Sequence, residues 1–529
     1  MKKYITLFNI IFVTVTFAQN HNTFLDEDTL DVNNVWLRSS NVGQCHYAFW
    51  QLLDNDFFNQ FIVFDHGPWL LGKVGEDTVL SISQWFSSYS PGPIINGQPA
   101  MLIHPEDSLR YRVYNVSKGD DSTNIDYAEW PVDFGAPVDD EGNPLILGDQ
   151  TLWAAFNSLD STVTNSIWWQ EDLQPFPVEF HQTVFAREGM ENDEQDIFAN
   201  TVFIEWEIIN KGNQQIDSAI FGFWTDIDFD DTFENRPGAD TMRQSGYCWS
   251  DNLITPYDSI PPAVGYCFLY GPVVPSIGST AIFKGRPLNN YKNLQLTSFR
   301  GIGDDAWPGL IYSPARSLRT AWNIARGFDS QGDLIIDPTT NTPTKFPLSG
   351  DPVTGNGWTF NSETGGGAGF VFFSGPFTLA PSDTQWAMVA IIPTKGESNL
   401  NSITQLRKKA EILLSLPYDS LAFGSVHYPI TDVKYNQNLN YPSEYILSQN
   451  YPNPFNPNTK IDYILPQAGF VNLTVYDLLG KEVSVLKNEE QKAGKYEINF
   501  NGRNLASGVY FFTLRVNDFT KTKKMVLMK

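Results

Sequence analysis

Apolar residues at every second position limit the folds open to this chain more than any other feature, and the pattern is clearest near the C-terminus. Ile461, Tyr463 and Leu465 form one such run, and another follows at 471–475. A period of two places these side chains on one face of a β-strand. Within residues 445–529, about six short strands of this kind are separated by glycine and asparagine turns, which predicts a small immunoglobulin-like β-sandwich.

The same segment opens with three prolines, Pro452, Pro454 and Pro457. Each proline fixes its φ angle and lacks the N–H group that a central strand needs for its hydrogen-bond ladder. This opening strap is therefore expected to be extended and to lie outside the interior of any sheet.

Five segments of the C-terminal region, in order and at plausible spacing, resemble the type A C-terminal sorting domain of the type IX secretion system. They are QNYPNPFNP at 449–457, YILP at 463–466, VYDLLGKEV at 475–483, LASGVYFF at 505–512 and KKMVLMK at 523–529. The resemblance implies that the outer-membrane translocon recognises residues 445–529, that this segment is commonly removed, and that the cargo is often attached to surface lipopolysaccharide. None of the five segments marks catalysis. The alternative is an inert terminal sandwich.

The N-terminus has the composition of a secretory signal peptide. Lys2 and Lys3 precede an apolar run at 5–17, and Thr16 and Ala18 offer small residues for cleavage before Gln19. No cysteine follows the cleavage position, so the signal is not of the lipoprotein type. No later stretch reaches the roughly 18 apolar residues of a transmembrane helix. These features predict export across the inner membrane. The resemblance to the sorting domain further implies passage through the periplasm and secretion, or retention on the outer surface of a Gram-negative bacterium.

The chain of 529 residues is too long for a single hydrophobic core. The expected segments are a signal peptide at 1–18, a body at 19–417 that could divide near residue 195, a linker at 418–444 and the sorting domain at 445–529. The formal net charge of −25 falls on the body, because the last segment holds more basic than acidic residues. An acidic body disfavours nucleic acid and anionic membranes as partners. It is compatible with cation binding, or simply with solubility.

The body is also expected to be β-rich, because aromatic residues make up 14% of the chain and it holds 39 glycines and 33 prolines. The clearest pattern is a predicted hairpin at 201–225. One short helix is expected at 402–416, and the stretch 289–369 is expected to be irregular. The predicted fold class is all-β: a large body of several β-sandwiches with one short helix, followed by the immunoglobulin-like sandwich.

Three cysteines, Cys45, Cys248 and Cys267, are available for disulfide chemistry. The predicted compartment permits disulfides, and a bridge between Cys248 and Cys267 would close a loop of about twenty residues and contribute about 3 kcal/mol. The alternative is a pair of reduced, buried thiols. Cys45 then has no partner, and the adjacent His46 would point to the opposite face of a strand.

Four acidic residues form the best candidate metal site. They are Asp226, Asp228, Asp230 and Asp231. Carboxylate oxygens clustered in a turn suit Ca²⁺, but Asp231 replaces the glycine that an EF-hand loop requires, so the segment is not an EF-hand. The two remaining interpretations are a lone calcium loop that holds the end of the predicted hairpin and a solvated acidic turn.

Two glutamates, Glu205 and Glu207, form the best candidate catalytic pair. They alternate with Trp206, so both lie on the strand face opposite that side chain. Same-face neighbours lie roughly 6.6 to 7 Å apart along a strand, which overlaps the carboxylate separation of roughly 6.5 to 9.5 Å in inverting glycoside hydrolases. The alternative is a solvated strand face. The sequence has no zinc-helix, nucleophile-elbow, phosphate-loop or dinucleotide-binding motif.

The leading functional prediction is a non-catalytic structural or binding protein that is displayed on the surface or released. The alternative is a secreted carbohydrate-active hydrolase that works through the carboxylate pair. Four segments of the body, at 68–74, 129–138, 223–228 and 349–358, resemble segments of large uncharacterised secreted proteins with the same sorting domain. That resemblance implies no activity.

Overall fold

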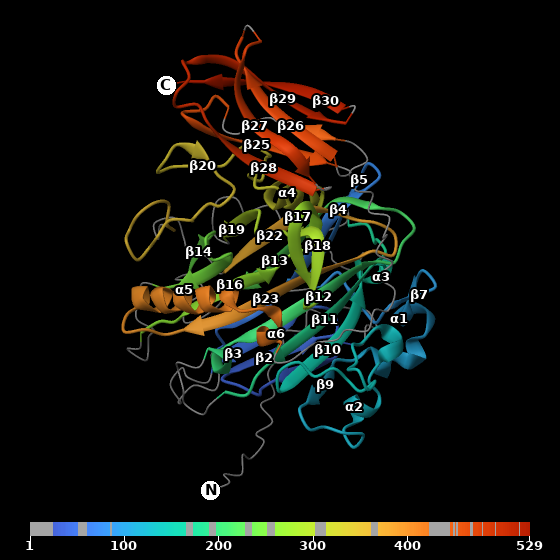
Figure 1. Ribbon diagram of the computed structural model, residues 1–529. Helices are drawn as coiled ribbons and strands as arrows, with labels where there is room; N and C mark the ends of the chain where they lie inside the picture. The colour runs from blue at the N-terminus through green and yellow to red at the C-terminus, as the bar shows by residue number, and fades with distance from the viewer. Residues whose placement is uncertain are drawn as a thin grey trace. The chain divides into compact units, whose positions relative to one another are not determined.

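The chain forms two compact units rich in β-strands, shown in a computed structural model (Figure 1). One unit comprises residues 1–272 and 294–433, and the other comprises 273–293 and 434–529. The predicted all-β fold class is confirmed. The structure describes residues 25–50, 61–84, 87–164, 173–189, 197–227, 235–250, 260–301, 314–360, 369–422, 445–447, 450, 453–465, 469–478, 480–491, 494–517 and 519–528. The predicted signal peptide lies outside these residues.

The first sheet of the body is antiparallel and has eight strands in the order β1-β2-β3-β4-β13-β22-β19, with β5 also paired to β4. A central position in this order belongs to the long strand β4, which pairs with β3, β5 and β13. The strands are β1 (Glu27–Leu30), β2 (Val35–Ser40), β3 (Cys45–Trp50), β4 (Val63–Val74), β5 (Asp77–Ile82), β13 (Ile216–Asp226), β19 (Ser298–Gly301) and β22 (Gly369–Leu379).

The second sheet of the body is also antiparallel and has nine strands in the order β14-β15-β16-β23-β12-β11-β10-β6, with β9 paired to β10. Its central strands are almost wholly buried. The strands are β6 (Ser90–Pro91), β9 (Tyr114–Ser117), β10 (Gln150–Asn157), β11 (Val178–Ala186), β12 (Val202–Asn210), β14 (Arg236–Asp240), β15 (Ser245–Trp249), β16 (Ala263–Tyr270) and β23 (Thr384–Thr394).

Aromatic side chains join the two sheets face to face. The ring of Trp206, on β12, lies 5.4 Å from that of Phe221 and 5.2 Å from that of Phe223, both on β13. Phe223 also lies 5.2 Å from Tyr266 of β16. All four side chains are fully buried, so the core of the sandwich is an aromatic layer between the sheets.

The predicted hairpin at 201–225 is wrong in its pairing. Both strands form, but β12 pairs with β11 and β23, whereas β13 pairs with β4 and β22. The chain crosses from one sheet to the other at 211–215, so the two apolar faces meet across the core. Because β11 precedes residue 195 and pairs along its length with β12, which follows it, the body does not divide there.

Helix α5 (Asn399–Ser415) confirms the helix expected at 402–416. Ser398 caps its start by accepting a hydrogen bond from the Asn401 N–H, which satisfies one of the free donors of the first turn. Leu406 packs so closely on Gly265 of β16 that a Cβ there would clash with it. Because Tyr266, the next residue, faces the other sheet, α5 covers the outer face of the nine-stranded sheet.

A second long helix, α4 (Pro314–Ala325), lies within the stretch 289–369 that was expected to be irregular, and corrects that expectation. Its Ala321 and Ile324 are buried in one cluster with Trp69 and Trp224. These tryptophans project from the outer face of the eight-stranded sheet, so each sheet of the sandwich carries one of these two long helices on its outer side.

The remaining elements are short helices and strands of the body and the hairpin of β17 and β18, which is grouped with the C-terminal unit. No helix in the described ranges is long and apolar enough to cross a membrane. The short elements are α1 (Ala100–Ile103), η1 (Pro105–Tyr111), α2 (Ile125–Ala128), η2 (Val132–Phe134), α3 (Ser161–Thr164), η3 (Phe198–Asn200), α6 (Tyr418–Leu421), β7 (Ile94–Ile95), β8 (Gln98–Pro99), β17 (Val273–Phe283), β18 (Arg286–Asn293), β20 (Ile336–Asp337) and β21 (Thr342–Pro343).

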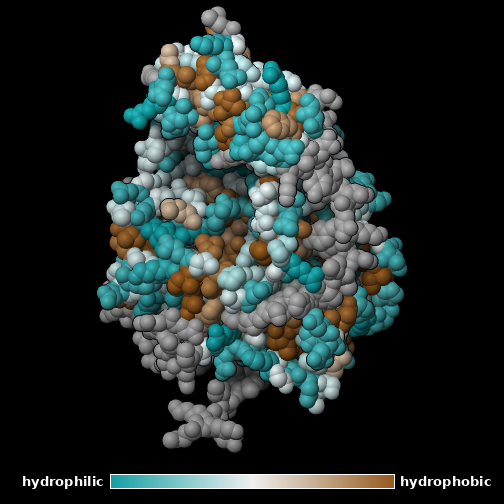
Figure 2. All heavy atoms as spheres, viewed as in Figure 1, coloured by the Kyte–Doolittle hydropathy of each residue, from teal (hydrophilic) through white to brown (hydrophobic). Residues whose placement is uncertain are grey.

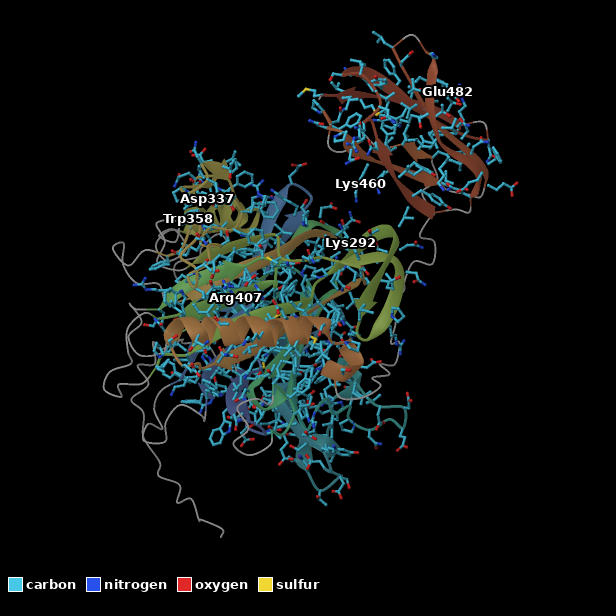
Figure 3. All side chains as sticks on the ribbon, turned by 60° about the vertical axis from the view of Figure 1, so that its left-hand side comes forward. Lys292, Asp337, Trp358, Arg407, Lys460 and Glu482 are labelled. Atoms are coloured by element: carbon cyan, nitrogen blue, oxygen red, sulfur yellow. The ribbon has the colours of Figure 1, made fainter. Side chains whose placement is uncertain are left out.

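The C-terminal unit is a two-sheet sandwich, as its sequence predicts. Figure 3 marks one residue of each sheet, Lys460 on β25 and Glu482 on β27. One sheet has the order β24-β25-β28, and the other has the order β27-β26-β29-β30. The strands are β24 (Ile446–Leu447), β25 (Asn458–Leu465), β26 (Gly469–Tyr476), β27 (Glu482–Gln491), β28 (Gly494–Asn501), β29 (Gly508–Val516) and β30 (Phe519–Leu527).

The sandwich of the C-terminal unit encloses its own apolar core, which includes the predicted inward residues Ile461, Tyr463 and Leu465 at 0% exposure. The face shown in Figure 2 is mostly hydrophilic over this unit, with single apolar residues among the polar ones. A separate core and a polar surface are what an independent folding unit requires.

Candidate functional site

Glu205 and Glu207 project from the outer face of the nine-stranded sheet, on the side of β12 opposite Trp206, as predicted. That face is not solvated, however. Glu205 is 3% exposed, and the side chain of Glu207 is 19% exposed. The interpretation of this pair as an ordinary solvated strand face is therefore wrong.

Glu205 lies beneath the short helix α6. The hydroxyl of Tyr418, the first residue of α6, donates a hydrogen bond of 2.7 Å to Glu205 Oε1. The Tyr418 ring also packs edge-on against Trp386 of β23, with 5.4 Å between ring centroids. Helix α6 thus covers this carboxylate with an aromatic side chain and satisfies one of its oxygens.

Glu207 lies beside a second set of charged residues. His181, directly opposite Glu207 on β11, has Nδ1 3.8 Å from Glu207 Oε2 and Nε2 2.9 Å from Glu179 Oε1. Lys211 Nζ lies 3.3 Å from the same Glu179 oxygen, and the Ile94 N–H donates to its other oxygen at 2.5 Å. Burial alone would raise the pKa of Glu179, but the hydrogen bond from His181 and the charges of His181 and Lys211 outweigh it and lower the pKa.

The imidazole of His181 is fixed between its neighbours. The Trp153 ring meets it edge-on at 5.4 Å, and Gly135 packs on its other side with a φ of 96°. A Cβ at Gly135 would clash with His181 Cε1, so only glycine allows this approach. Sequence reasoning missed Glu179 and His181, although charged residues at alternate positions of an otherwise apolar strand are a usable signal.

The structure describes only Asp226 among the four candidate calcium ligands. Asp228, Asp230 and Asp231 lie outside the described residues. Asp226 is the last residue of β13 and is directly opposite Asp65 of β4. Asp65 is fully buried and Asp226 is 7% exposed. This pair could not be predicted from sequence patterns, because the two aspartates belong to strands far apart along the chain.

Few donors surround Asp65. Gln44 Nε2 donates a hydrogen bond of 3.1 Å to Asp65 Oδ2, and His46 Nδ1 lies 3.8 Å from Oδ1. Burial, together with the charge of Asp226, raises the pKa of Asp65 well above its ordinary value. Burial and the charge of Arg38 lower the pKa of His46 to about 4, so its imidazole is neutral at physiological pH.

The pair Cys248 and Cys267 is not bridged, and all three cysteines are free and buried. Cys248 lies opposite Val264 and Cys267 opposite Ser245 on the adjacent strands β15 and β16. The two cysteines are therefore offset by three residues, roughly 10 Å along the strands, and they face opposite sides of the sheet. This register favours the alternative of reduced, buried thiols.

A different set of ligand-type side chains converges at the exposed surface. Ligand atoms of His104, Glu106 and Asp107 lie within 4.8 Å of one another at the start of η1. In the part of the chain that the structure describes, this is the one group of three or more histidine, cysteine or acidic side chains at such spacing. Each is at least partly exposed, so water can solvate all three without a metal.

In the C-terminal unit, the first and the last of the five segments that resemble the sorting domain come together. Phe455, in the opening strap, donates its N–H to Val526 O at 2.9 Å and accepts a hydrogen bond of 3.0 Å from the Met528 N–H. Asn453 Oδ1 accepts a further bond of 2.8 Å from the Val526 N–H. The strap thus lies along the edge of β30, as its prolines predict, and the two ends of the unit close on each other.

Comparison with known proteins identifies this unit. Residues 449–528 match the family model of the secretion system C-terminal sorting domain. Among the curated proteins, nothing matches the chain.

Two solved structures resemble the chain only weakly. A polysaccharide lyase is 8% identical, with a TM-score of 0.20 over 88% of this chain and 47% of that one. PorZ, a surface component of the type IX secretion system of Porphyromonas gingivalis, is 10% identical, with a TM-score of 0.12 over 96% of this chain and 51% of that one. The chain thus spans about half the length of each, and TM-scores this low carry no argument about fold or activity.

The assignment therefore rests on the C-terminal unit. Its five motifs, its self-contained core and the match over residues 449–528 agree with one another. Such a domain directs a protein to the secretion machinery and so to the cell surface or the medium. The chain is a cargo protein of the type IX secretion system, with a type A sorting domain at its C-terminus.

Proposed function

We propose that this protein is exported through the periplasm of a Gram-negative bacterium and acts outside the cell as a non-catalytic structural or binding module. The observation that carries the proposal is the sorting domain at 449–528, folded around a core of its own. The predicted signal peptide at 1–18 would supply passage of the inner membrane. Residues 445–529 would then engage the translocon, and surface lipopolysaccharide is the proposed anchor if the sorting domain is removed.

The charged residues of the body support a structural role. Glu179 is compensated by His181, Lys211 and a backbone N–H, and Glu205 is covered by Tyr418. Groups held in this way stabilise a fold, whereas a general acid or base must reach its substrate. Of the pair Glu205 and Glu207, only Glu207 has a side chain with appreciable exposure.

A secreted carbohydrate-active hydrolase is the second candidate. It is favoured by one feature, the imidazole of His181 with a carboxylate near each ring nitrogen. Polysaccharide hydrolysis measured for the wild type and for Glu207→Gln separates the two functions. We expect no turnover by either protein. Turnover by the wild type that Glu207→Gln abolishes would establish the hydrolase instead.

Export is tested by locating the native protein with and without residues 445–529. Surface labelling and fractionation should find the full chain outside the outer membrane and the truncated chain in the periplasm. A truncation within the body that leaves 445–529 in place is the matched control and should still leave the periplasm. Normal surface delivery of the chain without 445–529 would contradict the proposal.

A further inference from the structure

At one end of the eight-stranded sheet lie buried side-chain oxygens that accept no hydrogen bond from the residues that the structure describes. They are Asp65 Oδ1, Gln84 Oε1 and Asn235 Oδ1. Asp65 and Asn235 are 0% exposed and Gln84 is 1% exposed. A buried acceptor without a partner destabilises the folded state, so three at one place require a physical reason.

The hydrogen bonds around these oxygens link all three to the Asp65–Asp226 pair. Gln44 Nε2 donates both to Asp65 Oδ2 and to the backbone oxygen of Gln84. Asn235 Nδ2 donates a bond of 2.7 Å to the backbone oxygen of Ile227, the residue after Asp226. Asp65 and Asp226 are neighbours across β4 and β13.

The Asp65 carboxylate has no lysine or arginine partner among the described residues. Asp65 is within 4.0 Å of no lysine or arginine in these ranges; its nearest titratable nitrogen is His46 Nδ1 at 3.8 Å. Arg38 pairs instead with Glu27, at 3.6 Å. His66 is on the opposite face of β4, where Nδ1 lies 2.6 Å from the Tyr266 hydroxyl.

We propose that a divalent cation, Ca²⁺ by the chemistry of its ligands, binds at this end of the sheet between β4 and β13. Asp65 and Asp226 supply the charged oxygens, and the amide oxygens of Gln84 and Asn235 supply neutral ones. Ca²⁺ takes six to eight oxygen ligands in a flexible geometry and accepts carboxylate and amide oxygens alike. The nearby sulfur of Cys45 shares the His66 face of the sheet and is not a ligand.

The competing explanation is a proton shared by the two aspartates. Two carboxylates forced together out of water can retain one proton between them instead of binding a metal. The substitution Asp65→Asn separates the explanations, because asparagine imitates the protonated carboxyl but removes the charge that a cation needs. The matched control is Asp217→Asn, at the exposed start of the same strand β13.

The test is thermal unfolding of the full mature chain with chelator and with calcium at about 5 mM, above the dissociation constants typical of extracellular calcium modules. We expect calcium to raise the melting temperature of the wild type and of Asp217→Asn by several degrees, and to leave that of Asp65→Asn unchanged. An unchanged wild type, or a calcium effect that persists fully in Asp65→Asn, overturns the proposal. Because export is measured separately by localisation, the two proposals fail independently.

A second measurement applies if Asp65→Asn does not fold. Tb³⁺ replaces Ca²⁺ at oxygen sites, and Trp224, on the same face as Asp226 and two residues before it, is placed to sensitise its luminescence. We expect sensitised emission from the wild type that calcium displaces, and weaker Tb³⁺ binding by about tenfold in Gln84→Met, which keeps the side chain's length but loses its oxygen. Equal binding by the wild type and Gln84→Met overturns the ligand set.

Discussion

Two buried carboxylates of the body, those of Glu179 and Asp65, have different surroundings and opposite pKa shifts. Glu179 is surrounded by donors, from His181, Lys211 and the Ile94 N–H, and these lower its pKa. Asp65 has a second carboxylate as its neighbour, and its pKa is raised. Burial is similar for both side chains, so the partners decide the charge state.

Replacing Glu179 with glutamine should destabilise the protein in a manner that depends on pH. Because the pKa of Glu179 is lowered from 4.5, its contribution is complete above that value and is lost as the pH falls through the folded-state pKa. We expect Glu179→Gln to cost about 2 kcal/mol at neutral pH, the scale of hydrogen bonds to a charged group. Urea unfolding at neutral and acid pH measures this, with Glu188→Gln at an exposed position as the control. A difference between wild type and variant that stays constant down to acid pH would contradict the assignment.

The three thiols should be free yet unreactive in the folded protein. Burial raises the pKa of Cys45 to about 12 and raises those of Cys248 and Cys267, and only the thiolate is an effective nucleophile. Iodoacetamide without reductant should therefore modify no cysteine in the native chain and all three after unfolding, as counted by mass spectrometry. Modification of Cys45 alone after unfolding would show that the other two are bridged.

The positions of strands and helices along the chain could be predicted from the sequence more readily than the strands with which they pair or the surfaces on which they pack. The alternation that includes Trp206 and Trp224 correctly marks β12 and β13 as strands. It fixes which residues share a face but carries no information on which strand lies alongside, and so the predicted hairpin failed. Helix α5 has a clear apolar stripe, whereas α4 lies among glycines and prolines, and its buried face depends on contacts with Trp69 from a distant strand.

Arg407, which Figure 3 marks on α5, adds ion pairs to the apolar packing of this helix on the body. Arg407 Nη1 lies 2.7 Å from Asp351 Oδ1, and its Nε lies 3.3 Å from Asp240 Oδ2. We expect Arg407→Met to destabilise the protein by about 1–3 kcal/mol, because a buried aspartate loses a cationic partner. Denaturant unfolding measures the change, and Lys408→Met, at the next and exposed position, is the control. Equal effects of the two substitutions would contradict a specific role for Arg407.

The whole molecule combines a sorting unit that is readable from sequence with a body whose candidate sites are not. The sorting unit has local motifs, and its strap and last strand follow from prolines and alternation. The candidate cation site in the body joins Asp65 to Asp226 across strands that periodicity alone could not bring together. Glu179 and Lys211 likewise meet only through the register and turns of the folded sheet.

A substitution in the strap should affect the sorting unit alone. Phe455 is 2% exposed and packs on Phe500 within the core of that unit. We expect Phe455→Ala to destabilise the unit by about 3–5 kcal/mol, the usual cost of truncating a buried phenylalanine. In calorimetry, the transition of the sorting unit is the one that disappears when residues 445–529 are removed. The substitution should lower the melting temperature of that transition and leave the melting temperature of the body unchanged. Equal shifts of both transitions would contradict the independence of the two units.

Transfer of residues 445–529 to an unrelated periplasmic protein tests the central claim most directly. The fusion should reach the cell surface or the medium in a strain with a type IX secretion system and stay in the periplasm of a strain that lacks the translocon. The same fusion with Phe455→Ala should be exported less, because the strap no longer holds the unit closed. Retention of the intact fusion in the periplasm of the secreting strain would contradict the claim that this unit directs export.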